Sequence, residues 1–197
     1  MSTSMSVRGA ALLAMASQMG AFAIQFAASV ILARWFIDPE ELGLFTIAFS
    51  FVSLLAVLQE FGINRYVAGE PDLDEDGIRT AFTVSLAISW AIAIACVLLS
   101  WPAAAFYDLP GLLPLLLVVA ASYFFVPLAT VPMALLHRRM DFKSNTMIEI
   151  GVVLTNAAVA ITLAWHGYGA IALAWGAFAQ QVARAAIAQW RIGGRLP

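Results

Sequence analysis

Long apolar stretches separated by short polar segments make up almost the whole of this 197-residue chain. No charged residue occurs from Gly9 to Ala33 or from Ile150 to Ala183. An α-helix needs about 20 apolar residues to cross the hydrocarbon core of a bilayer. The pattern therefore predicts an all-α, polytopic membrane protein in which one six-helix transmembrane bundle forms a single domain, residues 1–197. The expected spans are 9–34, 41–66, 80–107, 112–136, 146–165 and 170–190.

Turn-forming residues mark where the predicted spans begin and end. Asp38, Pro39 and Glu41 suit the cap, the first and the third position of a helix, so they predict a capping box at the start of the second span. The acidic segment 69–79 is expected to be a loop outside the membrane. His-Gly-Tyr-Gly at 166–169 divides the second charge-free stretch into the fifth and sixth spans.

Prolines predict bends inside two spans. Pro114, Pro127 and Pro132 interrupt the fourth span, and an interior proline removes one backbone hydrogen bond and crowds the preceding turn. Pro127 lies farthest from both expected ends, so the kink is predicted there. A second bend is expected at Pro102 in the third span.

The basic residues lie mostly on one side of this predicted topology. With the N-terminus in the cytoplasm, Arg34 is the single basic residue on the outer side. The positive-inside rule therefore predicts a multi-pass membrane protein with both termini in the cytoplasm. The basic residues expected on the cytoplasmic side are Arg8, Arg65, Arg79, Arg138, Arg139, Lys143, Arg184, Arg191 and Arg195.

Composition agrees with the membrane class. Hydrophobic residues make up 62% of the chain and charged residues 11%, and the mean hydropathy is +0.89. Soluble domains carry about 25% charged residues. Basic residues occur singly between apolar stretches, which does not favour binding to nucleic acid. Cys96 is the single cysteine, lies in an apolar segment, and is expected to be an inert packing residue.

Polar residues inside the spans are candidates for function, because a polar group in hydrocarbon must find a partner or face water. Gln18, Gln25 and Ser29 are spaced by seven and four residues, so they share one face of the first span. They could line a cavity that binds sugar hydroxyls, or they could hold neighbouring helices together. A second polar group is expected to lie at the interfacial end of the sixth span: Gln180, Gln181 and Arg184.

Arg34 is the ionisable residue whose position on the outer side first suggests a substrate site. A guanidinium can bind a diphosphate in a bidentate manner. The alternative is that Arg34 extends to the membrane interface and pairs with Asp38 or Glu41. An ideal helix places Arg34 about 160° from Gln18 and 180° from Gln25, which weakens a shared cavity unless the first span bends.

Two acidic residues are further candidates. Glu60 lies near the inner end of the second span, where it could bind substrate together with Arg65 or form a helix-end ion pair with it. Glu149 ends the sequence Thr-Met-Ile-Glu at 146–149, which fits a capping box at the start of the fifth span. The alternative for Glu149 is a buried carboxylate.

Motifs for catalysis or cofactor binding are missing from the sequence. The two histidines, His137 and His166, are expected on opposite sides of the membrane, so they do not form a metal site. The chain has no Walker phosphate loop and no nucleophile elbow. We therefore expect neither an enzyme nor a protein with a cofactor or metal.

Four segments together resemble a known family of transporters. Residues 32–45 read LAR-x-x-x-x-PEE-x-G-L-F, and Glu60 is followed by Phe61-Gly62. The later segments are FYDLPGLLPLL at 106–116, VPMALLHRRMDFK at 131–143 and GYGAIALAWG at 167–176. The chain resembles the bacterial polysaccharide and lipopolysaccharide flippases of the multidrug/oligosaccharidyl-lipid/polysaccharide superfamily, and it corresponds to their N-terminal half.

This resemblance implies a protein of the bacterial cytoplasmic (inner) membrane that exports a lipid-linked oligosaccharide, carried on a polyprenyl diphosphate, in polysaccharide or lipopolysaccharide biosynthesis. It also implies contact with membrane lipids and pairing with a second half or a second copy of the chain. Two alternatives stay open. One is a drug or cation antiporter of the same superfamily, and the other is a truncated membrane subunit that does not transport.

Overall fold

Helices make up all the regular structure in the parts of the chain that the computed structural model describes, which are residues 7–50, 52–53, 75–138 and 142–192. The sequence predicted an all-α protein, and this is confirmed. A helix covers residues 39–50 and includes 52–53. The other helices are α1 (Val7–Trp35), α3 (Glu75–Tyr107), α4 (Leu112–Ser122), α5 (Val126–Arg138), α6 (Phe142–Trp165) and α7 (Ile171–Arg191).

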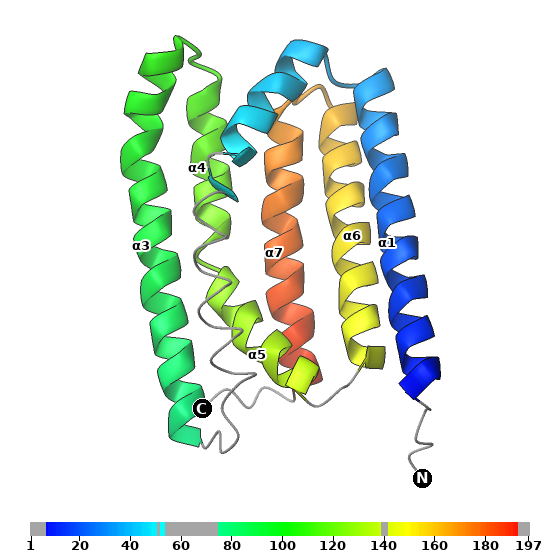
Figure 1. Ribbon diagram of the computed structural model, residues 1–197. Coiled ribbons are helices and arrows are strands. Elements are labelled where there is room, and N and C mark those ends of the chain that lie inside the picture. Colours follow the sequence, from blue (N-terminus) through cyan, green and yellow to red (C-terminus); the bar gives the residue numbers. More distant parts are fainter. Residues whose placement is uncertain (1–6, 51, 54–74, 139–141, 193–197) are drawn as a thin grey trace.

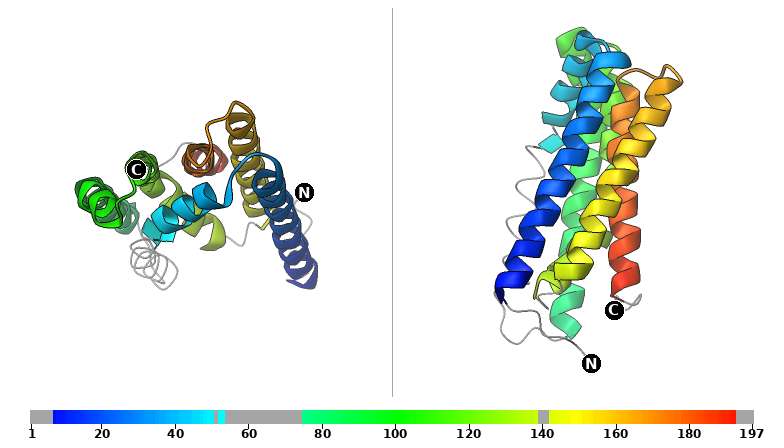
Figure 2. Two further views of the ribbon diagram at one scale, coloured as in Figure 1. Left: turned by 90° about the horizontal axis from the view of Figure 1, so that it is seen from above. Right: turned by 90° about the vertical axis from the view of Figure 1, so that its right-hand side faces the viewer.

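The long helices that the structure describes stand side by side as a curved wall (Figures 1 and 2). From one end to the other, the order is α3, then α4 with α5, then α7, α6 and α1, and each helix packs on the next. The 39–50 helix crosses one face of this wall near the end at which α1 stops (Figure 1). Among the described residues, the 39–50 helix is the element that lies across a face of the wall, and α1 and α3 lie at its opposite edges.

The expectation of six membrane spans is met only in part. Three helices among the described residues are long and apolar enough to cross a membrane: Met15–Trp35, Asp76–Tyr107 and Ser144–Trp165. The bent pair α4 and α5 gives up to four. α7 has the length of a span but is not among them, because its glutamines and arginines lower its hydropathy. Half of the expected second span, at 54–66, lies outside the described residues.

Small residues allow the helices of the wall to approach closely. α3 buries one residue per turn: Ala81, Ser85, Ser89, Ala93, Cys96, Ser100 and Ala104. A Cβ atom at Gly176 of α7 would lie 3.0 Å from Cβ of Ala160 on α6. Contacts of this kind drive helix association in lipid, where burying apolar surface gains little. Large apolar side chains instead cover the outside, and Trp35, Trp101, Trp165 and Trp190 are all exposed.

The predicted bend in the fourth span is confirmed, and it lies just before Pro127. α4 and α5 meet at 45°. Around the break, the amides of Tyr123 to Val126 and of Leu128 donate to carbonyls three residues back instead of four. Pro127 has no N–H to donate to the carbonyl of Tyr123, so the regular ladder stops there. By contrast, α3 runs as a continuous helix through Pro102.

Pro132 leaves a second carbonyl without its helical donor, that of Leu128. The side-chain amide of Gln189 on α7 donates to this carbonyl at 3.4 Å. A side chain of a neighbouring helix thus replaces a missing backbone bond, as membrane proteins require. This contact helps to hold α5 against α7.

Two predicted boundaries and one predicted side-chain cap are wrong. Residues 75–79 were expected in a loop but form the first turns of α3. α6 begins at Phe142, four residues before the predicted start of the fifth span. The capping box at 38–41 is not formed, because the carboxylate of Glu41 lies against Gly169 instead. The turn at 166–170 is as predicted, with Gly167 and Gly169 at φ of +81° and +55°.

The two ends of the wall carry different charges. The start of α1, the start of α3, and the ends of α5 and α7 all lie at one end (Figure 1). This end holds Arg79, Arg138 and Arg191, whereas Arg34 lies at the other end in the last turn of α1. The arrangement matches the expected sidedness of these residues. Which end faces the cytoplasm stays a prediction.

Candidate functional site

Among the described residues, two hydrogen bonds between nitrogen- and oxygen-bearing side chains join α6 and α7 within the wall. Glu149 accepts a hydrogen bond from Arg184 at 3.3 Å, and the two side chains form an ion pair in which each is 28% exposed. Farther along α6, Asn156 donates to the side chain of Gln180 at 2.7 Å. Glu149 and Asn156 both lie within the candidate membrane span Ser144–Trp165. We refer to these four residues as the polar pairs.

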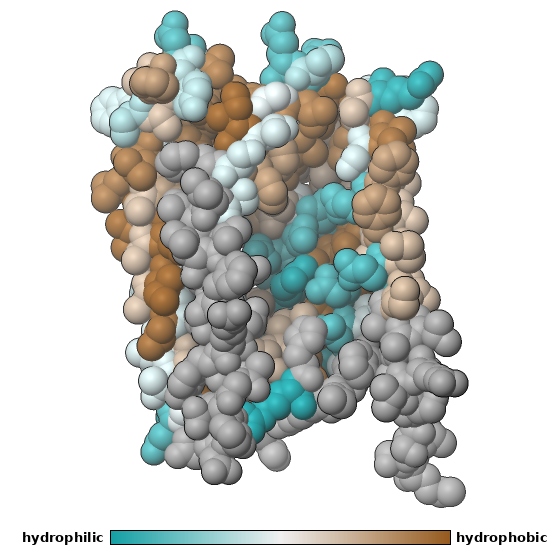
Figure 3. All heavy atoms as spheres, viewed as in Figure 1, coloured by the Kyte–Doolittle hydropathy of each residue, from teal (hydrophilic) through white to brown (hydrophobic). Residues whose placement is uncertain are grey.

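Helix periodicity explains why these residues meet. Asn145, Glu149 and Asn156 are separated by four and seven residues, which places them on one face of α6. Gln180 and Arg184 are one turn apart on α7. Because the two helices run in opposite directions, Glu149, the earlier of the two paired residues on α6, meets Arg184, the later one on α7, and Asn156 meets Gln180. Figure 3 shows hydrophilic residues gathered over α6 and α7 on the face that the 39–50 helix crosses.

Hydrogen-bonding capacity remains on this face. Nε of Arg184 and Oδ1 of Asn145 are buried without a hydrogen-bond partner. A guanidinium carries five N–H donors in a planar fork, so Arg184 can bind Glu149 and a second acceptor. In low-dielectric surroundings both the ion pair and any further charge-assisted bond are stronger than in water. Arg184 and Asn145 therefore keep hydrogen-bonding atoms on this face that are not used in the described contacts.

One prediction about these residues is wrong. Glu149 does not cap α6, because the helix starts at Phe142 and the Thr146–Glu149 sequence lies inside it. The alternative, a buried carboxylate, is not met in full, because the Glu149 side chain is 28% exposed. Its partner is a cation from another helix. Gln180 and Arg184 each contact α6, and the interfacial position expected for them stays a prediction.

The polar stripe of α1 has different surroundings. Gln18, Gln25 and Ser29 are exposed, and the hydroxyl of Ser29 donates to the carbonyl of Gln25 in its own helix. The stripe flanks the buried face of α1, which carries Ala21 and Ala28. In the part of the chain that is described, neither glutamine forms a hydrogen bond to another helix.

The remaining predicted site residues are not brought together with the polar pairs. Arg34 is exposed in the last turn of α1, and it forms no ion pair with Asp38 or Glu41 among the described residues. Glu60 and Arg65 lie outside the described residues. No group of three metal-binding side chains occurs within 7–50, 52–53, 75–138 and 142–192.

Sequence analysis did not single out Asn145, Asn156 or Gln189. The signal was present in the four- and seven-residue spacing of Asn145, Glu149 and Asn156 on one helix. It was overlooked because Glu149 was interpreted as a cap. Gln189 could not have been found in this way, since its partner is a backbone carbonyl.

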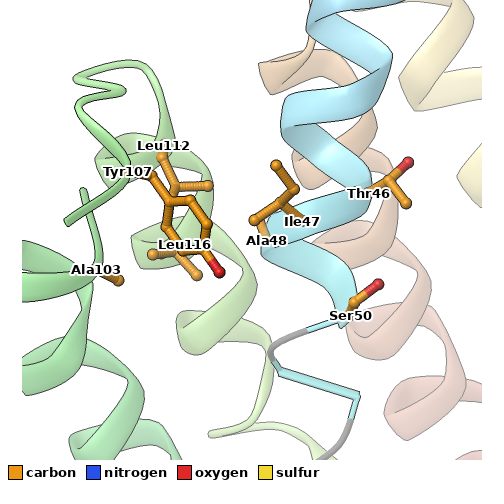
Figure 4. Close-up of a pocket in the computed structure, with 8 residues that line it drawn as sticks. All are labelled: Thr46, Ile47, Ala48, Ser50, Ala103, Tyr107, Leu112 and Leu116. Atoms are coloured by element: carbon orange, nitrogen blue, oxygen red, sulfur yellow. The ribbon is translucent and has the colours of Figure 1, made fainter. Parts of the chain in front are cut away.

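A cavity of about 360 Å³ lies elsewhere, between the 39–50 helix and the ends of α3 and α4 (Figure 4). Ile47 and Ala48 face Tyr107, Leu112 and Leu116 across it, while Thr46 and Ser50 point away from them. Its lining is mainly apolar. The cavity therefore offers packing space for apolar groups and few hydrogen bonds.

The apolar helices and the polar pairs between them define a multi-pass membrane protein whose wall contains groups able to bind a polar solute. Residues 31–196 match the protein family described as "Polysaccharide biosynthesis protein". The chain belongs to this family.

Two curated proteins are similar to this chain. The succinoglycan biosynthesis transport protein ExoT of Rhizobium meliloti (strain 1021) is 27% identical over 156 residues, which are 78% of this chain and 31% of that protein. The lipopolysaccharide biosynthesis protein WzxC of Escherichia coli (strain K12) is 25% identical over 124 residues, 63% of this chain and 25% of that protein. The chain thus spans about a third or less of these relatives. No solved structure matches it.

Proposed function

We propose that this chain forms one lobe of a flippase that moves a lipid-linked oligosaccharide across the bacterial cytoplasmic membrane during polysaccharide biosynthesis. The finer parts of this proposal are a six-span lobe, both termini in the cytoplasm, and a polyprenyl diphosphate as the carrier. Family membership supports the process, and the name of one relative includes transport.

The Glu149–Arg184 pair is the observation that carries the proposal. A flippase must move a charged, hydroxyl-rich head group through the membrane while the lipid tail stays in hydrocarbon. A charged pair is costly within a membrane-spanning helix pair and therefore marks a substrate pathway more often than a packing contact. Here the guanidinium offers donors for phosphate oxygens, while Asn156 and Gln180 offer donors and acceptors for sugar hydroxyls. Alternating access would follow if this lobe rocks against another.

The proposal keeps five further residues as secondary candidates for substrate binding: Gln18, Gln25, Arg34, Glu60 and Arg65. The exposed glutamines of α1 border the wall on which the polar pairs lie. The antiporter alternative is weaker, because it needs a deep acidic site for a cation. The candidates for that site are Glu60 and Glu149; Glu149 is already paired with a guanidinium, and Glu60 lies outside the described residues.

Deleting the gene that encodes this chain tests the proposed function. Surface polysaccharide should be lost, and lipid-linked oligosaccharide should accumulate on the cytoplasmic side of the membrane. Restoring the wild-type gene should reverse both effects, whereas an Arg184→Gln variant, made to equal protein level, should not. Normal surface polysaccharide in the deletion strain would contradict the proposal.

Thiol labelling tests the proposed topology. In a Cys96→Ala background, cysteines would be introduced at Asp76 and at Tyr168, which are both exposed and lie at opposite ends of the wall. An impermeant reagent added outside intact cells should label the Tyr168→Cys protein and spare the Asp76→Cys protein. Labelling of both sites from one side would overturn the topology.

A further inference from the structure

Glu41 connects the 39–50 helix to the turn between α6 and α7. A Cβ atom built on Gly169 would lie 2.7 Å from Oε2 of Glu41, and it would be in still closer contact with Oε1. The carboxylate therefore occupies the space beside Gly169 in which any other residue would place its side chain. Gly169 is buried and Glu41 is half-buried, so this contact excludes much of the solvent.

The position of the carboxylate suits its charge. α7 starts at Ile171, two residues after Gly169, and its cap residue Ala170 forms no side-chain hydrogen bond to the helix. The first N–H groups of a helix lack acceptors within it and carry a partial positive charge. The carboxylate of Glu41 adds a negative charge at this end of α7, from a residue more than 120 positions earlier in the chain.

The same face of the 39–50 helix contacts a second turn. Leu44, three residues after Glu41, lies so close to Gly111 that a Cβ there would be 3.1 Å from its Cδ2 atom. Ala48, one turn later, is fully buried in the core that α3, α4 and α7 form. This face therefore bridges the α3–α4 turn and the α6–α7 turn at one end of the wall (Figure 1).

We propose that the 39–50 helix is a strap that closes this end of the polar face, and that the contact of the Glu41 carboxylate with Gly169 holds the strap in place. The strap crosses the wall on the face where hydrophilic residues gather (Figures 1 and 3). Displacing the Glu41 carboxylate from Gly169 frees the strap and admits water to α7 from the end that holds the 166–170 turn. This goes beyond the proposed function, because it assigns a moving part and does not depend on the substrate.

Two neighbouring glycines provide matched variants for the test. Gly167 and Gly169 both have positive φ, so alanine strains the backbone at either position. A Cβ at Gly167 meets no atom within 4 Å, whereas one at Gly169 meets Glu41. Gly169→Ala should displace the carboxylate, and Gly167→Ala should reproduce the strain without the displacement.

The measurement is the labelling rate of a cysteine at Ala177 in the Cys96→Ala background, with an impermeant maleimide added from the side of the 166–170 turn. Ala177 lies one turn before Gln180 on the same face of α7. Glu41→Ala and Gly169→Ala should each raise the rate about two- to fivefold, the range expected when a charge leaves a helix terminus. Glu41→Gln, which keeps the size of the side chain, should raise the rate as well.

The Gly167→Ala variant should keep the wild-type rate, and combining Glu41→Ala with Gly169→Ala should add little to either change. An unchanged rate in both Glu41→Ala and Glu41→Gln would overturn the proposal. So would an equal increase in Gly167→Ala, because strain in the turn would then be the cause. Monodisperse elution in detergent serves as the check on folding, and Glu41→Gln is the variant to use where Gly169→Ala fails it. The labelling rate tests the strap alone, whereas export is measured separately. An unchanged labelling rate would therefore overturn the strap and leave the proposed function standing.

Discussion

The polar residues of α1 and those of α6 and α7 differ in what surrounds them. Gln18 and Gln25 form a regular stripe on α1, but both are exposed and lie beside its packing face. Glu149 and Asn156 form a similar stripe on α6, and each contacts a polar side chain of α7. The stripe on α1 can be recognised from that helix alone. The role of the stripe on α6 becomes clear only from its partners on α7.

The comparison shows that spacing on one helix identifies a face but not its role. A polar face can border water, line a path or bind another helix, and the partner decides which. The charge of Arg184 is stabilised by Glu149, whereas Arg34 extends from a helix end without a described ion-pair partner. Substitutions in the two stripes should therefore have effects of different size.

The largest effect is expected for Glu149→Leu. This change leaves the guanidinium of Arg184 among apolar helices, and a guanidinium stays charged under all ordinary conditions. The free energy of unfolding should fall by about 1–3 kcal/mol. This is below the range for fully buried pairs, because each side chain is 28% exposed. Thermal unfolding in detergent provides the measurement.

The partner substitution sharpens this test. Arg184→Leu should cost less than Glu149→Leu, since a lone carboxyl group can take up a proton and become neutral. The double variant Glu149→Arg with Arg184→Glu should recover most of the stability. Equal stability of wild type and Glu149→Leu would show that the ion pair contributes nothing to the fold.

Much of the fold could be predicted from the sequence, because hydropathy reports directly on membrane spans. The starts and ends of α1 and α7 were predicted to within two residues, and the bend before Pro127 follows from the chemistry of proline. A bend was also predicted at Pro102; α3 continues as a helix through this proline, and the bend itself stays a prediction. One proline removes one bond, and surrounding contacts decide whether the helix breaks.

The candidate site could be predicted only in part. Glu149 was identified, but its partner was not, because residues 35 positions apart meet only after α6 and α7 pack. Glu41 was interpreted through its own helix, where the sequence fits a capping box. Its actual contact is with Gly169. A local sequence pattern cannot indicate a contact between residues so far apart in the chain.

A smaller effect is expected when the second polar pair is broken. Asn156→Leu should lower the free energy of unfolding by about 1 kcal/mol, the size typical of hydrogen bonds between membrane helices. Adding Gln180→Leu should restore part of the loss, because no polar group then remains unpaired. The two single variants and the double variant, compared by thermal unfolding, form a complete cycle. Strict additivity of the two single effects would mean that the residues do not interact.

Smaller still is the expected effect of Gln18→Leu and Gln25→Leu on stability. Both side chains are exposed, so the free energy of unfolding should change by no more than about 0.5 kcal/mol. If the stripe contacts substrate, export per molecule of protein should nevertheless fall in the double variant. Unchanged export would remove both glutamines from the candidate site and leave them as polar residues at the edge of the wall.

The smallest effect is expected for Arg34→Lys, and it separates two roles for the exposed cation. If Arg34 only extends to the membrane interface, an ammonium serves as well, so both stability and export should stay at the wild-type level. If Arg34 binds a diphosphate, lysine cannot reproduce the planar fork, and export should fall although the charge is kept.

Arg184→Lys is the matched comparison, since Arg184 is held by Glu149 and its donors are fixed in direction. We expect a loss of export for Arg184→Lys and none for Arg34→Lys, each normalised to protein level. A loss in both would make the outer end of α1 part of the substrate path. A loss only in Arg34→Lys would move the site away from α6 and α7.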